Sequence, residues 1–119
     1  MTVGIDSVEI DRIGQSIQNE RFLNRVYGEN ELIELRDAGT KAQRAASSFA
    51  AKEAFSKAVG TGIGGFSLTQ AELLHNENGR PYLLLSGSAL QLAEEMGLRF
   101  EVSITHTANI ATAIVIGWK

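Results

Sequence analysis

The spacing of apolar residues switches from strand-like to helix-like early in the chain. A short apolar strand opens the sequence with Asp6 at or near its end, and helical spacing then continues to Ile17. The same spacing predicts three more helices, one from Arg21, one over Glu29–Ala38 and one over Lys41–Val59. The last is rich in alanine and lacks glycine and proline, and a glycine follows it, which indicates one long uninterrupted helix.

The second half of the chain contains short strands and one further helix. In chain order the predicted elements are strands at Leu73–His75 and Tyr82–Leu85, a helix at Ser88–Met96, and strands at Arg99–His106 and Ile110–Trp118. A glycine-containing turn joins the first two strands into a hairpin. Ser88 and Gln91 have the spacing of a capping box. This order predicts an α+β fold in which an antiparallel sheet packs against helices.

The composition indicates a single domain over residues 1–119. Hydrophobic residues make up 44% of the chain, and the single proline and the lack of low-complexity tracts argue against a linker. The absence of cysteine excludes disulfides and thiolate metal ligands. A net charge of −3 argues against general nucleic-acid binding, which depends on a basic surface. We expect a cytoplasmic protein without a membrane span, because the sequence has no signal-like segment and no long apolar run.

Two side chains of the long helix have the chemistry to bind a metal-bound phosphate. Glu53 and Lys57 are four residues apart and share one helix face, whereas Lys52 points elsewhere. The carboxylate can hold a hard cation while the ammonium group one turn later meets a phosphate oxygen. The alternative is an ordinary ion pair on a solvated surface, which would contribute little to stability.

Asp6 is a carboxylate within an apolar segment. Its burial would be costly without a positive partner, and a cation shared with Glu53 would provide one. The alternative is that Asp6 caps the N-terminus of the helix that follows.

Four short motifs occur in order along nearly the whole chain. They are Gly4-Ile5-Asp6 followed by Glu9 and Arg12, Phe49-Ala50-Ala51-Lys52-Glu53-Ala54-Phe55-Ser56-Lys57-Ala58 with Gly60-Thr61-Gly62, Asn78-Gly79-Arg80-Pro81-Tyr82, and Val102-Ser103-Ile104-Thr105-His106-Thr107. This set resembles the holo-acyl-carrier-protein synthases, a family of small 4'-phosphopantetheinyl transferases. One position differs, because the family's usual arginine five residues before the glutamate is Ser48 here, and the nearest basic residue on that face is Arg44.

The resemblance implies an enzyme that moves 4'-phosphopantetheine from coenzyme A to a serine of an apo-acyl carrier protein. The second product would be adenosine 3',5'-bisphosphate, and the reaction would serve fatty acid or polyketide biosynthesis. We expect Asp6 and Glu53 to hold Mg²⁺, with waters and pyrophosphate oxygens as the other ligands and Glu9 as the runner-up carboxylate. Lys57 would hold the pyrophosphate or protonate the leaving group, and Glu53 would accept the serine proton directly or through a metal-bound water.

Further residues are expected at the coenzyme A site. Gly60 and Gly62 can present backbone N–H groups to an anion, although they follow a helix C-terminus, where the helix dipole disfavours anions. A helix C-cap with a flexible connection is the alternative. The resemblance adds Arg80 and Pro81 from the hairpin turn and His106 from a strand. Taken alone, these would be a solvated turn and a structural histidine.

The segment from residue 12 to residue 25 is suited to an acidic partner. Arg12, Arg21 and Arg25 are interspersed with apolar residues, and this arrangement also fits a plain amphipathic helix pair. The resemblance favours the first interpretation, with an acyl carrier protein as the partner. It also implies a homotrimer with active sites between subunits, and the strand segment Ile114–Ile116 is apolar on both faces.

Two other classes of function fit parts of the same pattern. A non-catalytic module could use the glycines and arginines to recognise a nucleotide or an acidic partner. A magnesium-dependent hydrolase could cut coenzyme A or a related pyrophosphate, with water in place of the serine hydroxyl.

Overall fold

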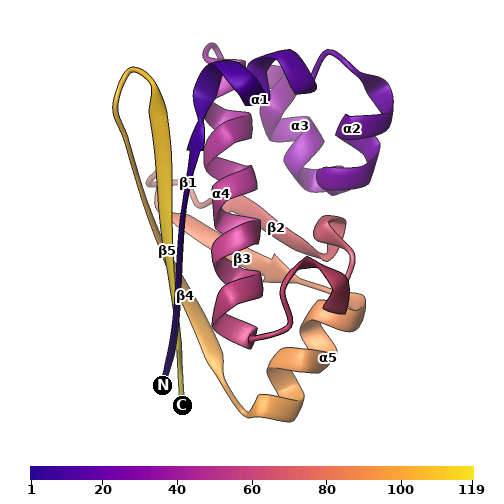
Figure 1. Ribbon diagram of the computed structural model, residues 1–119, viewed down its shortest axis with the longest axis vertical. Helices are drawn as coiled ribbons and strands as arrows, with labels where there is room; N and C mark the ends of the chain where they lie inside the picture. The colour runs from indigo at the N-terminus through magenta and orange to yellow at the C-terminus, as the bar shows by residue number, and fades with distance from the viewer.

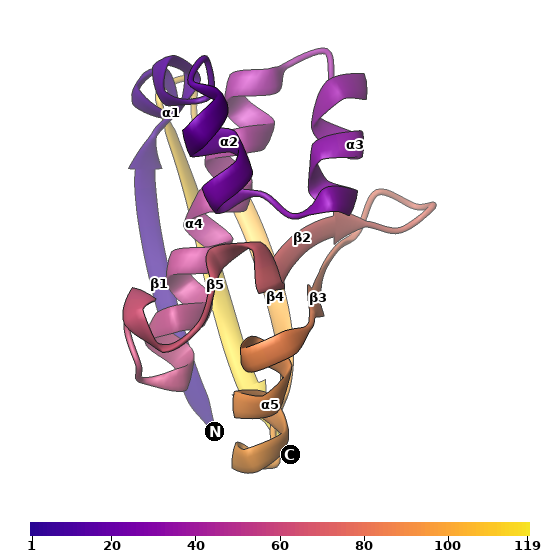
Figure 2. The same cartoon turned by 90° about the vertical axis from the view of Figure 1, so that its right-hand side faces the viewer.

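A long central helix lies between a three-stranded antiparallel sheet and a layer of shorter elements (Figures 1 and 2). This computed structural model describes residues 1–119, apart from the side chain of Ile63. In chain order the elements are β1 (Thr2–Glu9), α1 (Ile10–Ser16), α2 (Glu20–Val26), α3 (Glu29–Asp37), α4 (Lys41–Val59), the 3-10 turns η1 (Ile63–Gly65) and η2 (Leu68–Gln70), β2 (Ala71–His75), β3 (Pro81–Leu85), α5 (Gly87–Met96), β4 (Arg99–His106) and β5 (Ile110–Trp118).

The predicted α+β architecture is confirmed, and α4, β4 and β5 have the predicted bounds. The strand order is β1-β5-β4, all antiparallel, and β2 and β3 form a separate two-stranded hairpin. The helices lie on one side of the three-stranded sheet (Figure 1), and α4 packs directly against β1 and β5. Among the described residues, no helix combines the length and the apolar character that a membrane span requires.

The prediction that Asp6 lies at or near a strand end is wrong. β1 continues to Glu9 because Ser7, Val8 and Glu9 pair with Thr112, Ala111 and Ile110 of the long strand β5. Asp6 is therefore a mid-strand residue opposite Ala113, and it does not cap α1. Because side chains alternate between the two faces of a strand, the place of Asp6 within β1 determines the face to which its side chain points.

The predicted capping box at Ser88 is also wrong. The N-cap of α5 is Ser86, and Ser88 lies inside the first turn of the helix. Its backbone N–H donates to the side-chain oxygen of Gln70 at 3.1 Å, so a residue from η2 satisfies this helix terminus. This partner is 18 positions away in the sequence, beyond the reach of a local pattern.

Gly4 sets how closely β1 approaches α4. A Cβ atom at this position would lie 1.9 Å from the carbonyl oxygen of Ala54 and 2.8 Å from the backbone nitrogen of Ala58. Such separations are far inside van der Waals contact, so any larger residue would push the strand away from the helix. Ala54 lies between Glu53 and Lys57 in the sequence. Its contact with Gly4 therefore brings the β1 backbone close to the part of α4 that carries the side chains of Glu53 and Lys57.

A buried ion pair joins α4 to α3, on the side of the helix away from β1. Lys52 donates to Glu31 of α3 at 2.5 Å and to the backbone carbonyls of Leu68 and Ala71, so its three N–H groups all have acceptors. Glu31 also accepts from the hydroxyl of Ser48 and from the N–H of Leu73. Burial lowers the pKa of Lys52, and the negative charge of Glu31 opposes this shift. The expectation that Lys52 points away from Glu53 is thus met.

Replacing one member of this pair is expected to destabilise the fold. Lys52→Met leaves the Glu31 carboxylate buried without its cation, so the free energy of unfolding should fall by about 3–5 kcal/mol. Urea unfolding of the variant measures this change, and the exposed Lys41→Met in the first turn of α4 is the control. A Lys52→Met protein as stable as the wild type would show that the pair does not hold α3 against α4.

Candidate active site

The even-numbered residues of β1 face α4. Gly4 is buried against the helix and Asp6 is partly buried, whereas Val3 and Ile5 on the opposite face are 60% and 56% exposed. Because side chains alternate along a strand, the carboxylate of Asp6 is directed to the same side as Gly4. The strand therefore presents one charged group to the helix at the closest point of their contact.

Lys57 makes its ion pair with Asp6. Its ammonium group donates to Asp6 Oδ1 at 3.3 Å and to the carbonyl oxygen of Ile5 at 2.9 Å. Glu53, which precedes Lys57 by one turn on α4, is not its salt-bridge partner in the described residues. The alternative of a simple Glu53–Lys57 surface pair is therefore wrong for this structure, and the cation of α4 is directed across to β1.

The charges of Asp6 and Lys57 both act on Glu53, so the three side chains form one charged cluster. Its pKa is raised, first by partial burial and second by the negative charge of Asp6, while the positive charge of Lys57 lowers it. A carboxylate whose pKa is raised by a neighbouring carboxylate lacks sufficient positive charge nearby. This is the condition under which a divalent cation would be favoured at the site.

The donor set is compatible with Mg²⁺ bound together with a phosphate ligand. Within residues 1–119 as described, no group of three or more His, Cys, Asp and Glu side chains is arranged to hold a metal. Mg²⁺ does not require such a group, because it is commonly bound through one or two carboxylates plus substrate phosphates and water. Glu9, the runner-up ligand, lies at the end of β1 as the N-cap residue of α1 and is exposed.

The glycines after α4 extend this cluster by one helical turn. Gly60 ends the helix with φ +80° and Gly62 follows with φ +64°, and neither would bring a Cβ atom within 4 Å of other residues. The left-handed conformation favours glycine at both positions, and the open space leaves the local backbone accessible. The segment is therefore both a C-cap and an accessible backbone beside Lys57.

Three predicted coenzyme A residues lie elsewhere in the chain. His106 bonds to the side-chain amide of Gln43 at 2.8 Å, and Gln43 is ten residues before Glu53, about 15 Å along the α4 axis. Arg80 pairs with Glu101 of β4 at 3.3 Å, and Pro81 begins β3. The hairpin tip projects away from β1 (Figure 2). One chain thus does not bring these residues to Asp6 and Glu53.

Arg44 and His75 form a separate cluster with Glu34. The guanidinium of Arg44 lies 3.3 Å from Glu34, and Nδ1 of His75 lies 2.9 Å from the same oxygen. Arg44, the basic residue one turn before Ser48, is therefore engaged on the α3 side of α4. Ser48 instead donates to the buried Glu31.

The three predicted partner-binding arginines are exposed on α1 and α2. Arg12, Arg21 and Arg25 all have solvent-exposed side chains. Arg12 borders a hollow of about 380 Å³ that also reaches Glu53. Its apolar lining consists of Val8, Ile13, Phe22 and Phe49. Sequence reasoning missed this junction, because Phe49 and Phe22 are brought together only by packing of α2 on α4, where their rings stack at 6.1 Å.

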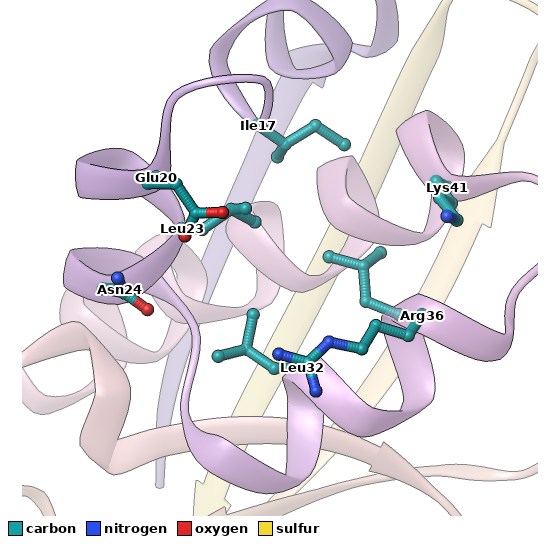
Figure 3. Close-up of a pocket in the computed structure, with 8 residues that line it drawn as sticks. Ile17, Glu20, Leu23, Asn24, Leu32, Arg36 and Lys41 are labelled. Carbon is teal, nitrogen blue, oxygen red and sulfur yellow. The ribbon is translucent and has the colours of Figure 1, made fainter.

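A second hollow of about 230 Å³ lies between α2, α3 and the start of α4 (Figure 3). It is lined by Ile17, Glu20, Leu23, Asn24, Leu32, Leu35, Arg36 and Lys41. None of the predicted site residues is among them. This hollow is therefore distinct from the cluster formed by Asp6, Glu53 and Lys57.

Comparison with known proteins assigns the family. The profile of the 4'-phosphopantetheinyl transferase superfamily matches residues 2–115. The chain belongs to this superfamily.

Relatives of this superfamily are similar over nearly their whole length. The holo-acyl-carrier-protein synthase of Fusobacterium nucleatum is 38% identical over 116 residues, which are 96% of this chain and 95% of that protein. The crystal structure of the Neisseria meningitidis synthase has a TM-score of 0.91 and 33% identity, covering 99% of this chain and 98% of that one. The Helicobacter pylori synthase in complex with coenzyme A has a TM-score of 0.84 and 30% identity, covering 98% and 99%.

The resemblance read from the four motifs is thus confirmed, as is the fold class. Both family-defining segments at the start of the chain and in α4 meet in the structure, because Gly4-Ile5-Asp6 packs on the helix that carries Glu53 and Lys57. Two of the motifs that carry the resemblance therefore meet where the charged side chains of Asp6, Glu53 and Lys57 lie.

The raised pKa of Glu53 gives a pH prediction. Since only ionised Glu53 can ligate a cation, affinity for Mg²⁺ should fall as the pH falls through a pKa above the ordinary glutamate value. Asp6→Asn removes one cause of the shift, so the pKa of Glu53 should decrease in this variant. Carboxyl ¹³C NMR titration measures both proteins, with exposed Glu95 as the internal control. An unchanged Glu53 pKa would show that Asp6 does not act on it.

Proposed function

We propose that the protein transfers the 4'-phosphopantetheine group of coenzyme A to a serine hydroxyl of an apo-acyl carrier protein. The observation that carries this proposal is the meeting of Asp6, Glu53 and Lys57 at the β1–α4 contact in a chain of the 4'-phosphopantetheinyl transferase superfamily. The relatives named holo-acyl-carrier-protein synthase, and the coenzyme A complex of one of them, support both substrates.

The reaction replaces a phosphoanhydride bond with a phosphoester bond. The serine oxygen attacks the phosphorus that bears the pantetheine group, and the bond from this phosphorus to the bridging pyrophosphate oxygen breaks. Adenosine 3',5'-bisphosphate leaves, and the serine proton goes to a base. Positioning and charge stabilisation supply most of the catalysis in such a transfer.

Asp6 and Glu53 would hold Mg²⁺ together with pyrophosphate oxygens. When bound, the ion supplies positive charge that neutralises the phosphate oxygens. Lys57 has the reach to donate to a pyrophosphate oxygen, since its ammonium group is already near Asp6. Glu53 would also accept the serine proton, because its carboxylate lies beside the proposed pyrophosphate site.

The remaining coenzyme A contacts would come from the glycines after α4 and from another subunit. We assign Gly60 and Gly62 to the nucleotide from the same chain as Lys57, and Arg80, Pro81 and His106 from a neighbouring chain. This division is supported by the distance of His106 from Glu53 along α4 and by its place at the end of β4.

A homotrimer would supply such a neighbour. The outer face of the three-stranded sheet carries an apolar patch on β1 and β5, in which Val3, Ile5, Ile116 and Trp118 are exposed. An apolar face of this kind is more typical of a subunit interface than of a surface in water. The same face includes Glu101, the partner of Arg80, whereas His106 at the end of β4 lies on the α4 side of the sheet, where it bonds to Gln43. Association through the outer face would therefore bring Arg80, one of the proposed second set of coenzyme A residues, near another subunit.

Arg12, Arg21 and Arg25 would contact the carrier protein. Carrier proteins are acidic, so these exposed cations complement the partner and steer the encounter. The hollow lined by Phe22 and Phe49 offers an apolar anchor between the arginines and Glu53. We place the reaction in the cytoplasm, where coenzyme A and carrier proteins serve fatty acid or polyketide synthesis, and assign it to a single domain over residues 1–119.

Loss of either proposed metal ligand should abolish transfer. Asp6→Ala and Glu53→Ala each remove charge that the cation needs, so Mg²⁺-dependent transfer should fall by about 100-fold or more while the fold is retained. The assay incubates the protein with coenzyme A, Mg²⁺ and an apo-carrier protein and then measures the molecular mass of the carrier. Glu95→Ala, which removes an exposed carboxylate of α5, is the matched control.

The same assay separates the three function classes. A carrier that gains one phosphopantetheine supports transfer, free phosphopantetheine indicates hydrolysis, and an unchanged carrier with intact coenzyme A indicates a binding module. Full activity of Asp6→Ala or Glu53→Ala would contradict the ligand assignment.

Charge reversal should separate the carrier face from the coenzyme A site. Arg12→Glu with Arg21→Glu repels an acidic partner, so the KM for the carrier should rise about tenfold or more with little change in coenzyme A affinity. Steady-state kinetics and coenzyme A calorimetry measure the two quantities. Arg36→Glu with Lys41→Glu, two residues that line the second hollow, is the charge-matched control. If both affinities fell together, the partner face would be assigned wrongly.

A further inference from the structure

Lys57 occupies one side of the proposed cation site in the ligand-free protein. Its ammonium group contacts Asp6 Oδ1 and the carbonyl of Ile5, which are both on β1, at 3.3 and 2.9 Å. An ammonium group at this distance occupies one of the carboxylate oxygens that a divalent cation would use. The contact is thus more than a surface ion pair, because its acceptor is a proposed metal ligand.

The two partners differ in mobility. The side chain of Asp6 is 19% exposed and is held on a central part of β1, whereas that of Lys57 is 53% exposed and lies in the last turn of α4. Lys57 also has four rotatable bonds, and the open glycine segment follows it directly. Asp6 therefore forms a fixed position, and Lys57 is the group that can move away.

The charges of the cluster favour this exchange. Asp6 and Glu53 together carry two negative charges, and Lys57 balances one of them in the ligand-free protein. A divalent cation that entered while Lys57 stayed would lie beside a positive charge and would compete for Asp6. The pyrophosphate of coenzyme A offers Lys57 a new anionic partner, and this releases the carboxylate.

We propose that Lys57 holds the place of the divalent cation in the ligand-free protein, and that coenzyme A draws it from Asp6 onto the pyrophosphate as the cation binds. This inference rests on the proposed function. It makes Lys57 a gate for the cation as well as a ligand for the phosphate. Cation and coenzyme A are then coupled through Lys57, in addition to any direct bond between the cation and a phosphate oxygen.

The proposal makes an unusual prediction, since removal of a catalytic cation should improve binding of a ligand. In the absence of coenzyme A, Lys57→Met should bind the divalent cation about fivefold or more tightly than the wild type, a change within the usual range of coupling between sites. Coenzyme A affinity should fall in the same variant. Lys57 is half exposed, so the substitution leaves the core unchanged, and circular dichroism melting verifies this.

The experiment titrates each protein with Mn²⁺ and counts the free ion by its EPR signal, and Mg²⁺ is then added as competitor. Arg12→Met is the matched control, because it removes one positive charge from the hollow that reaches Glu53 without being a recorded partner of Asp6. This control measures the long-range effect of charge alone, which should be less than about twofold at physiological ionic strength. The titrations are repeated with saturating coenzyme A to obtain the coupling factor.

Two results would overturn the proposal. One is unchanged or weaker cation binding by ligand-free Lys57→Met, and the other is equal tightening in Arg12→Met. Support requires selective tightening in Lys57→Met and a smaller coupling factor between cation and coenzyme A than in the wild type. If wild-type protein transfers phosphopantetheine but Lys57→Met fails to bind the cation more tightly, only this inference is lost. If the wild-type protein does not modify the carrier at all, the proposed function itself fails.

Discussion

The close approach of β1 to α4 is the constraint on which the site depends. Gly4 has no side chain, so the strand backbone lies against the carbonyl of Ala54 and the nitrogen of Ala58. The alanine-rich face of α4 permits this distance, because Ala50, Ala51, Ala54 and Ala58 are buried and small. Asp6 and Lys57 can meet only because no larger side chain separates their backbones.

Charged side chains have different environments on the two sides of α4. On the α3 side, Lys52 and Glu31 are buried with all their hydrogen-bonding capacity used, which suits a permanent structural contact. On the β1 side, the half-exposed Lys57 pairs with Asp6, and the carboxylate of Glu53 beside this pair has a raised pKa. The neighbouring residues Lys52 and Glu53 therefore differ in role: Lys52 stabilises the fold on one face of α4, and we propose that Glu53 binds a ligand on the other.

The distribution of site residues also indicates what a single chain can and cannot do. Asp6, Glu53, Lys57 and the following glycines come together within one chain, and this set is sufficient for the proposed cation and pyrophosphate contacts. His106 is held by Gln43 at the other end of α4, and Arg80 is held by Glu101 at the sheet. The exposed apolar residues of the sheet lie on β1 and β5, and Glu101 lies on the neighbouring strand β4. Our proposal of shared sites follows from this separation.

The sequence by itself determined the element types, the bounds of α4, β4 and β5, and the family. The periodic spacing of apolar residues and the four motifs are local properties of the chain, so they can be found without the structure. Only the tertiary structure decided that β1 runs past Asp6, that Gln70 satisfies the start of α5, and that Lys57 pairs with Asp6 instead of Glu53. Each of these depends on a partner far away in the sequence. The pairing of β1 with β5, the contact of β1 with α4 and the contact of η2 with α5 supply those partners. A linear pattern contains no information on which distant groups will become neighbours.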